Sequence, residues 1–301
     1  MTVNTTAIKS FLEPGLNAIF GDYPMYPAQW REIFTTYPSD KAVEKDVEVK
    51  LLGLAQLKAE GASTNYDDMG ERYTTSYVNR YVSTGFIITR QAIKDNQYKS
   101  AFPMQAKALK NAFGQAKETL GAAVLNNGFD GTNYPIGDSE ALFSTAHPID
   151  GNTVANRPTA DVDLNETTME AAMISIQGFR DQAGLRMMAQ PRKLVVARDN
   201  QFIAARLLRG DWQMDSANRN INALKNMNMI PEGFVVNQFL TDADAWFVLT
   251  NADNGFKHFQ REAFETDMYT DFDNDNLKVK GIERYSFGVS NFRAAFGTSG
   301  A

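Results

Sequence analysis

The sequence predicts an α+β fold in which a long β-hairpin is followed by a long helix and then by a mixed block of strands and helices. Residues 41–88 alternate apolar or small side chains with charged ones, as expected when successive residues point to opposite faces of a strand. From Ser100 the apolar spacing changes to three and four residues, which is typical of a helix with one apolar face. Beyond residue 165, short apolar runs and helical patterns follow one another.

The composition is that of an ordinary globular protein and excludes several classes of site. Of 301 residues, 43% are hydrophobic and 22% are charged, so the chain can bury a core and is too apolar for disorder. Its net charge of -6 lacks the basic footprint of a protein that grips phosphates. The absence of cysteine excludes disulfides and thiolate metal sites, and two histidines are too few for most zinc sites. We therefore expect no metal and no cofactor.

Two further patterns bear on the location of the protein. The first twenty residues lack the charged start and the apolar run of a signal peptide. No apolar stretch reaches the length that crosses a bilayer. We expect a soluble protein, made in the cytoplasm, with no membrane partner.

The first forty residues read as an irregular arm. Prolines prevent a long helix, although "PAQWREIF" is expected to form one or two helical turns. The arm is rich in aromatic residues, which either pack on the chain's own core or lie across a neighbouring subunit. These residues are Phe20, Tyr23, Tyr26, Trp30 and Phe34.

A long β-hairpin is predicted over residues 41–88. A strand begins near Val47, a tip rich in Gly, Ser, Asn and Asp follows, and the return strand runs to residue 88. Neither face of the return strand is apolar enough to line an ordinary core. Either the hairpin leaves its domain to meet another subunit, or it is the edge of a larger sheet. One face carries Tyr73, Thr75, Tyr77, Asn79 and Tyr81, and the other carries Thr74, Ser76, Val78, Arg80 and Val82.

The longest predicted helix covers residues 100–126. Ser100 is the expected N-cap, Pro103 is tolerated in the first turn, and "NNG" after Leu125 is a stop signal. Lys107, Lys110 and Glu118 are expected off the apolar face. At 1.5 Å per residue the helix would be about 40 Å long. Its apolar face consists of Leu109, Phe113, Ala116, Leu120 and Val124.

The rest of the chain is predicted as a turn-rich segment over 129–163 and then a mixed α/β block. Helices are expected over 166–182 and over "DNQFIAARLL", with Asp199 as the N-cap of the second. The expected strands are "KLVVA", "GFVVNQFL" and "AWFVLT", followed by strands returning to a sheet in "LKVKGIERYSFGVSNFRAAFG".

Motifs that could carry chemistry fail on their spacing. Ser144 and His147 in "STAHP" lack the flanking glycines of a hydrolase elbow, so an ordinary loop histidine is the better interpretation. His258 lies in no recognisable motif. In "DFDNDN" the alternate aspartates from Asp271 resemble a calcium loop, but Asn276 and Ile282 stand where that loop needs Gly and Glu. We predict no catalytic, cofactor-binding or metal-binding residue, and no enzyme.

The order of elements, together with four stretches, resembles the major capsid protein of tailed bacteriophages, which has the HK97-like fold. The resemblance is closest to Mu-type major head subunits. The order of elements covers nearly the whole chain, and the closer similarity is confined to "GERYTTSYVNRYVSTGFIITRQAIKDNQY", "LNNGFDG", "ALFSTAHP" and "LTDADAWFVLTN".

The resemblance implies a division of the chain into named parts. The hairpin would be the E-loop, which extends over a neighbouring subunit, and the long helix would be the spine of the peripheral domain. The implied parts are an N-terminal arm (1–40), the E-loop (41–88), the peripheral domain (89–160), the axial domain (161–265) and the return strands of the peripheral domain (266–301).

The resemblance also implies a structural function. The chain would self-assemble into pentamers and hexamers of an icosahedral shell that encloses double-stranded DNA in the virion, after assembly in the host cytoplasm. Scaffold, portal and decoration proteins would be further partners, and contact with DNA would be loose and non-specific. The candidates for contact between subunits are Trp30, Arg72, Tyr73, Tyr77, Arg80 and Tyr81.

Two alternatives remain open at this stage. An encapsulin-like compartment shares the implied fold but encloses protein cargo. A stand-alone hydrolase that uses Ser144 or His147 is less favoured, because its motif is incomplete.

Overall fold

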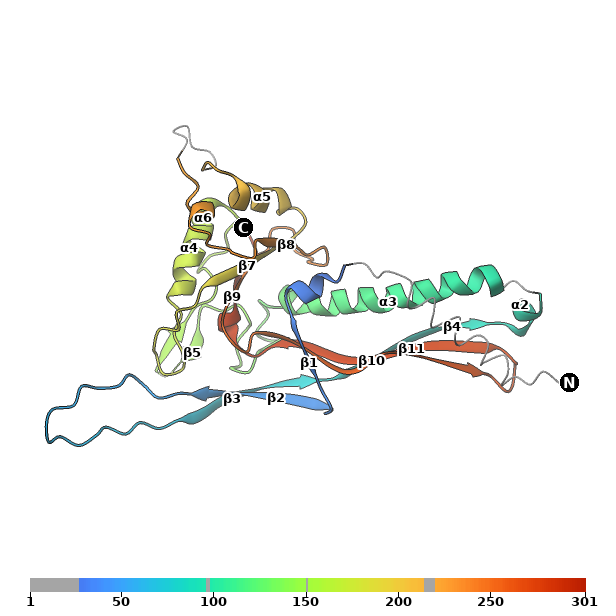
Figure 1. The fold of residues 1–301 in the computed structure, drawn as a ribbon, viewed down its shortest axis with the longest axis horizontal. Coiled ribbons are helices and arrows are strands. Elements are labelled where there is room, and N and C mark those ends of the chain that lie inside the picture. The colour runs from blue at the N-terminus through green and yellow to red at the C-terminus, as the bar shows by residue number, and fades with distance from the viewer. Residues whose placement is uncertain (1–26, 96–97, 150, 214–219) are drawn as a thin grey trace.

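The computed structural model describes residues 27–95, 98–149, 151–213 and 220–301. Figure 1 shows three parts: a long sheet lying under a long helix, an α/β unit at one end of that sheet, and a β-hairpin extending outward below the α/β unit. The predicted segment with Phe20, Tyr23 and Tyr26 lies outside the described residues.

The long sheet is built mainly by the C-terminal part of the chain. Its order is β1 (Thr35–Pro38), β10 (Phe256–Thr270), β11 (Leu277–Val289) and β4 (Arg80–Ile88), and all neighbours are antiparallel except β1 and β10. Strand β10 was not predicted. Two register shifts between Gln260 and Glu265 interrupt the pairing within this strand. A bulge of this kind breaks the two-residue alternation by which a strand is recognised.

Helix α3 (Tyr98–Asn126) covers one face of this sheet. Leu109 and Phe113 from the predicted apolar face are buried against strands β4, β10 and β11. The helix begins at Tyr98, so Ser100 lies inside its first turn and is not the N-cap. Before it, the short helix α2 (Arg90–Lys94) is capped by Thr89.

Glu118 departs from the sequence-based expectation that it would be solvated. It is 8% exposed, and its two carboxylate oxygens accept hydrogen bonds from the backbone N–H groups of Gln29 and Trp30 at 2.7 and 3.0 Å. These donors open the 3-10 turn η1 (Gln29–Glu32), the turn expected in "PAQWREIF". Burial raises the pKa of Glu118, and the two N–H groups oppose that rise. The carboxylate ties the start of the chain's described part to the long helix.

The α/β unit contains a second sheet of order β12-β9-β7-β8. Its strands are β7 (Pro191–Val196), β8 (Phe234–Val236), β9 (Trp246–Thr250) and β12 (Ala295–Thr298). Helices α4 (Glu166–Gln177), α5 (Gln201–Arg209) and α6 (Ala223–Asn226) pack with this sheet around a core that includes Met169 and Trp246. Asn200, not Asp199, precedes α5 as its N-cap. Helix α4 ends at Gln177, five residues earlier than predicted, with Gly178 as its C-cap.

The hairpin consists of β2 (Val43–Lys50) and β3 (Gly70–Val78), paired from Val43–Val78 to Lys50–Gly70. The predicted single return strand is divided at Asn79, after which β4 joins the long sheet. Asn79 is buried, and its side-chain N–H groups donate to Ser39 Oγ and to the Lys41 carbonyl, both at 2.8 Å. One continuous segment therefore belongs first to the hairpin and then to the body.

A small hairpin, β5 (His147–Ile149) and β6 (Asn152–Val154), interrupts the turn-rich segment, and the 3-10 turn η2 (Phe292–Ala294) separates β11 from β12. "DFDNDN" is the turn between β10 and β11. There Asp271 pairs with Lys278 at 2.6 Å and Asp275 pairs with Arg90, so these carboxylates are held by cations of the same chain.

His258 lies in an aromatic core between the long sheet and η1. Its ring is fully buried, with centroids 4.5 Å from both Trp30 and Phe287. Burial, reinforced by the charges of Lys117 and Arg31, lowers the pKa of His258 to about 3. The imidazole is therefore neutral in the folded chain at neutral pH.

We predict that Phe113→Ala lowers the free energy of unfolding by about 3–5 kcal/mol, because it empties a core position. Phe113 is 2% exposed and packs edge-on against Phe264, with centroids 4.9 Å apart. Met104→Ala on the same helix is the control, since Met104 is 72% exposed. Urea unfolding followed by circular dichroism measures both. A similar loss in the two variants would contradict this account of the core.

We predict that His258→Phe removes part of the chain's sensitivity to acid. A histidine that titrates near 6.5 when unfolded and near 3 when folded takes up a proton mainly on unfolding as the pH falls. From pH 7 to pH 5 this costs the wild type about 2 kcal/mol of stability, which the variant should retain. Unfolding curves at the two pH values measure the difference. Equal losses in both proteins would show that His258 is not held neutral.

Candidate functional site

Strand β2 places its acidic residues toward the body of the molecule and its valines toward solvent. Its side chains are alternately exposed and partly buried, and the partly buried set includes Glu44, Asp46 and Glu48. A half-buried strand normally turns its apolar face to the core, so this strand is inverted. We call Val43, Val47, Val49 and Leu51 the valine face; their exposures are 38, 43, 41 and 56%.

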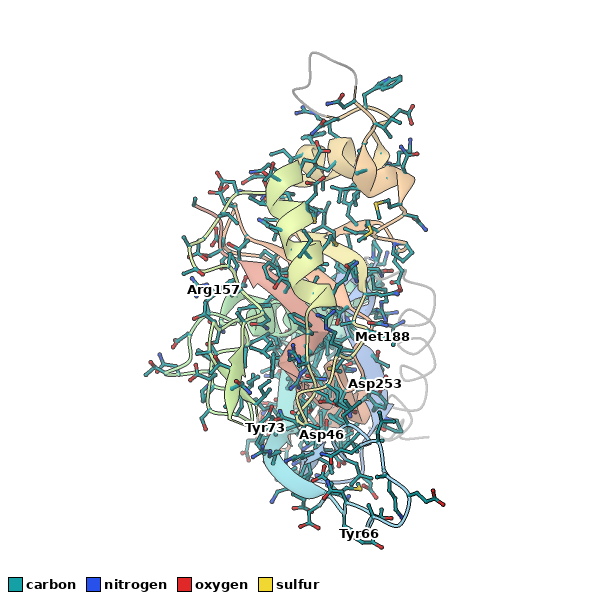
Figure 2. All side chains as sticks on the ribbon, turned by 90° about the vertical axis from the view of Figure 1, so that its left-hand side faces the viewer. Asp46, Tyr66, Tyr73, Arg157, Met188 and Asp253 are labelled. Carbon is teal, nitrogen blue, oxygen red and sulfur yellow. The ribbon has the colours of Figure 1, made fainter. Side chains whose placement is uncertain are left out.

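The exposed apolar surface continues into the loop that joins β2 to β3. Figure 2 places Tyr66 at the lower edge of the molecule, below Asp46 and Tyr73. Lys45 shares the exposed face of β2 with the valines. Exposed apolar side chains gathered in this way on a folded chain favour a contact with another molecule. The large apolar side chains more than half exposed in the loop are Leu52, Leu54, Leu57, Tyr66 and Met69.

Asp46 fastens the hairpin to the long sheet. Its Oδ2 lies 2.5 Å from the ammonium of Lys257 on β10 and accepts a hydrogen bond from Ser290 Oγ, also at 2.5 Å. The Tyr77 hydroxyl in turn hydrogen-bonds Ser290. Burial and the charge of Asp46 raise the pKa of Tyr77 above its ordinary value, so the phenol stays protonated.

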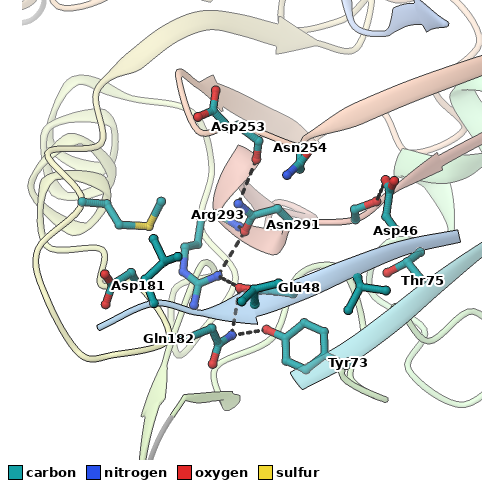
Figure 3. Close-up of a pocket in the computed structure, with 15 residues that line it drawn as sticks. Asp46, Glu48, Tyr73, Thr75, Asp181, Gln182, Asp253, Asn254, Asn291 and Arg293 are labelled. Atoms are coloured by element: carbon teal, nitrogen blue, oxygen red, sulfur yellow. Dashed lines mark hydrogen bonds and ion pairs between the residues drawn. The ribbon is translucent and has the colours of Figure 1, made fainter. Parts of the chain in front are cut away.

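Glu48 fastens the hairpin to the α/β unit. Its Oε1 lies 2.8 Å from Arg293 Nη1 of η2 and accepts a hydrogen bond from Gln182 Nε2 at 3.0 Å (Figure 3). Gln182 also donates to the Tyr73 hydroxyl, and burial followed by the Glu48 charge raises the pKa of Tyr73. The Arg293 side chain is 1% exposed, so it is a buried cation. Removing its partner carboxylate would cost about 3–5 kcal/mol.

A cavity of about 300 Å³ opens where these contacts meet. Its lining includes both carboxylates, and Figure 3 shows side chains from the hairpin, the segment after α4 and the segment after β11 converging on it. In the described part of the chain, no three His, Cys, Asp or Glu side chains are grouped to hold a metal ion. The arrangement holds segments together through charge.

Two of the predicted subunit contacts, Trp30 and Tyr77, are core residues of their own chain. Trp30 is 5% exposed and packs against His258 and Phe287. Tyr77 is 3% exposed, with its ring 4.9 Å from that of Phe259. The reason is the same for both residues. Each is a large aromatic ring on a strand or turn that the chain itself covers, and the polar residues beside it in the sequence gave no indication of this.

The other four predicted contacts lie at or near the surface. Arg72, Arg80 and Tyr81 are exposed, Tyr81 by 58%, while Tyr73 is half-buried against Gln182. Tyr73 and Tyr77 belong to the same face of β3, which is turned toward the body. Arg72, Arg80 and Tyr81 remain candidates for contact with another subunit.

His147 is a structural residue that connects three loops. It is fully buried, and its ring lies flat on Phe292 with centroids 3.8 Å apart. Nδ1 lies 2.7 Å from Asp138 Oδ2 and Nε2 lies 3.1 Å from Asn156 Oδ1. Ser144 Oγ donates to Glu140 at 3.1 Å, so the serine and the histidine do not form the contact that a hydrolase needs.

The residues that hold the hairpin were not identified from the sequence: Asp46, Glu48, Lys257 and Arg293. Periodicity places Asp46 and Glu48 on one face of β2 and the valines on the other, but it does not say which face meets the body. The partners lie more than 200 residues further along the chain. The sequence does show acids alternating with valines on β2. That pattern usually means that the valines face the core, whereas here the acids do.

Comparison with known proteins identifies the family. The chain matches the phage capsid protein family over residues 72–297, and no curated protein matches it significantly. No helix among the described residues is long and apolar enough to cross a membrane.

Several solved structures share the fold at low sequence identity. The capsid of bacteriophage JBD30 decorated with minor capsid protein trimers has a TM-score of 0.58 and 15% identity, covering 80% of this chain and 100% of that one. A virus-like particle from Pyrococcus furiosus has a TM-score of 0.55 and 9% identity, with 95% and 97% covered. The capsid of an empty GTA particle has a TM-score of 0.54 and 13% identity, with 93% and 95% covered.

The predicted α+β capsid fold is thereby confirmed, while the closer affinity to Mu-type head subunits stays a prediction. The family match spans three quarters of the chain, from β3 to β12, and includes the long helix, the α/β sheet and the long sheet apart from β1. The chain belongs to the phage capsid protein family.

Proposed function

We propose that this chain is the major subunit of a phage head, and that its copies assemble into pentamers and hexamers of an icosahedral shell around double-stranded DNA. The observation that supports this beyond family membership is the inverted strand β2, whose valine face has no cover within the described chain. A second copy is the partner that a shell supplies at every subunit. The hairpin is then the E-loop, lying over its neighbour.

The distribution of contacts fits this assignment. Figure 1 shows the hairpin reaching beyond the body, so its own chain is poorly placed to cover the valine face. Arg72 lies on β3 of the hairpin, and Arg80 and Tyr81 lie on β4, which follows it in the chain. All three are exposed and would supply polar contacts beside the apolar ones. Contacts of this kind between different patches of two copies are heterologous and close into rings.

We take the proposed parts of the chain to follow its structural units, with their bounds adjusted to the strand pairing. The peripheral domain (89–160 with 266–301) contains α3, β11 and the end of β10, and the axial domain (161–265) contains the α/β unit apart from β12. Residues 256–265 lie in β10 of the long sheet, and β12 pairs with β9 of the α/β sheet. The arm (1–40) enters the long sheet through β1, and the E-loop proper ends at Asn79.

The remaining proposed partners follow from the shell. The net charge of -6 favours loose, non-specific contact with packaged DNA, because few phosphates would be neutralised. Scaffold, portal and decoration proteins would join the shell during assembly in the host cytoplasm, and the mature location would be the virion. The role is structural: the polar clusters of Asp138 with His147 and of Glu48 with Arg293 are engaged within the chain.

An encapsulin-like shell that encloses protein cargo is the second candidate. The similarity to the virus-like particle from Pyrococcus furiosus over 95% of this chain supports this second candidate. The two functions share a fold and differ in what the particle contains.

We predict that the purified chain, with its scaffold where required, forms closed shells or rings of five and six copies. Negative-stain electron microscopy beside size-exclusion chromatography tests this. Nucleic acid in particles isolated from infected cells would support the phage head, and protein cargo would support the compartment. A stable monomer under all these conditions would overturn both.

We predict that Val47→Lys blocks assembly while the monomer stays folded, because it places a charge in an apolar contact between copies. A single buried charge without a partner weakens such a contact by several kcal/mol. Val47→Thr, which keeps the branched shape, is the control and should assemble. Size-exclusion chromatography measures assembly, and circular dichroism checks the fold. Normal shells from Val47→Lys would show that the valine face is not the contact.

A further inference from the structure

The two strands of the hairpin contact the body by different means. On β3, Tyr77 packs its ring against Phe259, and Gly288 leaves the room for it, since a Cβ there would lie 2.7 Å from Tyr77 Cε1. On β2, the contacts with the body are charged: Asp46 with Lys257 and Glu48 with its partner in η2. Strand β3 is therefore held by aromatic packing and by the hydroxyl hydrogen bonds of Tyr73 and Tyr77, and the charged contacts belong to β2.

The two carboxylates of β2 are held by different parts of the body. Asp46 binds Lys257 on the long sheet and Ser290 just beyond β11. Glu48 binds Arg293 in η2 and Gln182 in the segment after α4. Because Asp46 and Glu48 lie two residues apart on one face, about 7 Å along the strand, a rotation of the hairpin stretches at least one of these contacts.

The hairpin has a bulge opposite Glu48. The register of β2 with β3 shifts between Val47 and Val49, where Arg72 and Tyr73 of β3 lie opposite Glu48 alone. The extra residue is therefore on β3, and bulges bend a strand and increase its twist locally. The outer carboxylate contact thus lies beside a bulge of the partner strand.

We propose that Asp46 and Glu48 form a carboxylate clamp that sets the angle of the hairpin to the body, with Tyr77 as the pivot. The clamp holds the acidic face inward and so turns the valine face outward. This inference deepens the proposed function and rests on it. In a shell, the clamp would orient the surface that meets the next copy. When the clamp is open, the hairpin remains attached at Tyr77 and through the chain at Asn79, but its direction varies.

The test is the double variant Asp46→Asn with Glu48→Gln, which keeps the shape of both side chains and removes their charge. Hydrogen exchange of the unassembled full chain, read by mass spectrometry, reports the opening of the hairpin. We expect exchange in β2 to accelerate at least about tenfold, with β7 and β9 unchanged. Glu71→Gln is the matched control, because Glu71 is an exposed carboxylate on β3 of the same hairpin.

Each outcome decides the inference. Unchanged exchange in β2 would overturn it, and so would faster exchange throughout the chain, because the carboxylates would then belong to the folding core. Where the wild type assembles, the double variant should give shells of mixed diameter, and Glu71→Gln should give uniform ones. Uniform shells from the double variant would also overturn the inference. A wild type that never assembles would refute the proposed function and leave the exchange result standing.

Discussion

The inward-facing carboxylates of β2 are the constraint on which the hairpin's geometry depends. Burying part of a carboxylate is unfavourable unless a partner cation and hydrogen bonds compensate for the lost water. Here Lys257 and Arg293, both less than 12% exposed, supply that compensation from the far end of the sequence. The arrangement is reciprocal, because each cation would itself be an uncompensated buried charge without the hairpin. Once the acids face inward, the two-residue period of a strand leaves the valines facing out.

The C-terminal segment acts as the link between the parts of the molecule. Strand β11 pairs with β10 and β4 in the long sheet, and β12 pairs with β9 in the α/β sheet. Between them, η2 and its flanking residues contact the hairpin through Ser290 and Arg293 and lie against His147 through Phe292. Asn156 reinforces this point by donating to three backbone carbonyls, at 2.7–3.1 Å, including that of Phe292. A short stretch thus joins both sheets and the base of the hairpin.

Local patterns predicted the regular elements, and long-range contacts decided the rest. The apolar spacing of Leu109 and Phe113 was sufficient to find α3, since helix periodicity is set within the helix itself. Strand β10 was missed because its bulges break the alternation, and Asp199 was preferred to Asn200 because both are good caps and only backbone geometry separates them. Trp30 and Tyr77 were predicted to contact another subunit because the neighbouring residues in the sequence do not show what covers them. The inverted face of β2 could not be predicted, because Lys257 and Arg293 join it only in the folded chain.

A capsid subunit needs a surface that stays soluble before assembly and becomes buried afterwards, and β2 meets both needs with one pattern. The side chains of the valine face are each 38–56% exposed, so each is partly covered in the free chain. In the proposed shell the same modest contact, repeated at every subunit, would add to a large total through multivalency. Apolar contact has little directional preference, so it would tolerate small differences in angle between the proposed rings of five and of six. The orientation of the hairpin must therefore be set by other contacts. In this chain the charged inner face of the same strand is placed to set it.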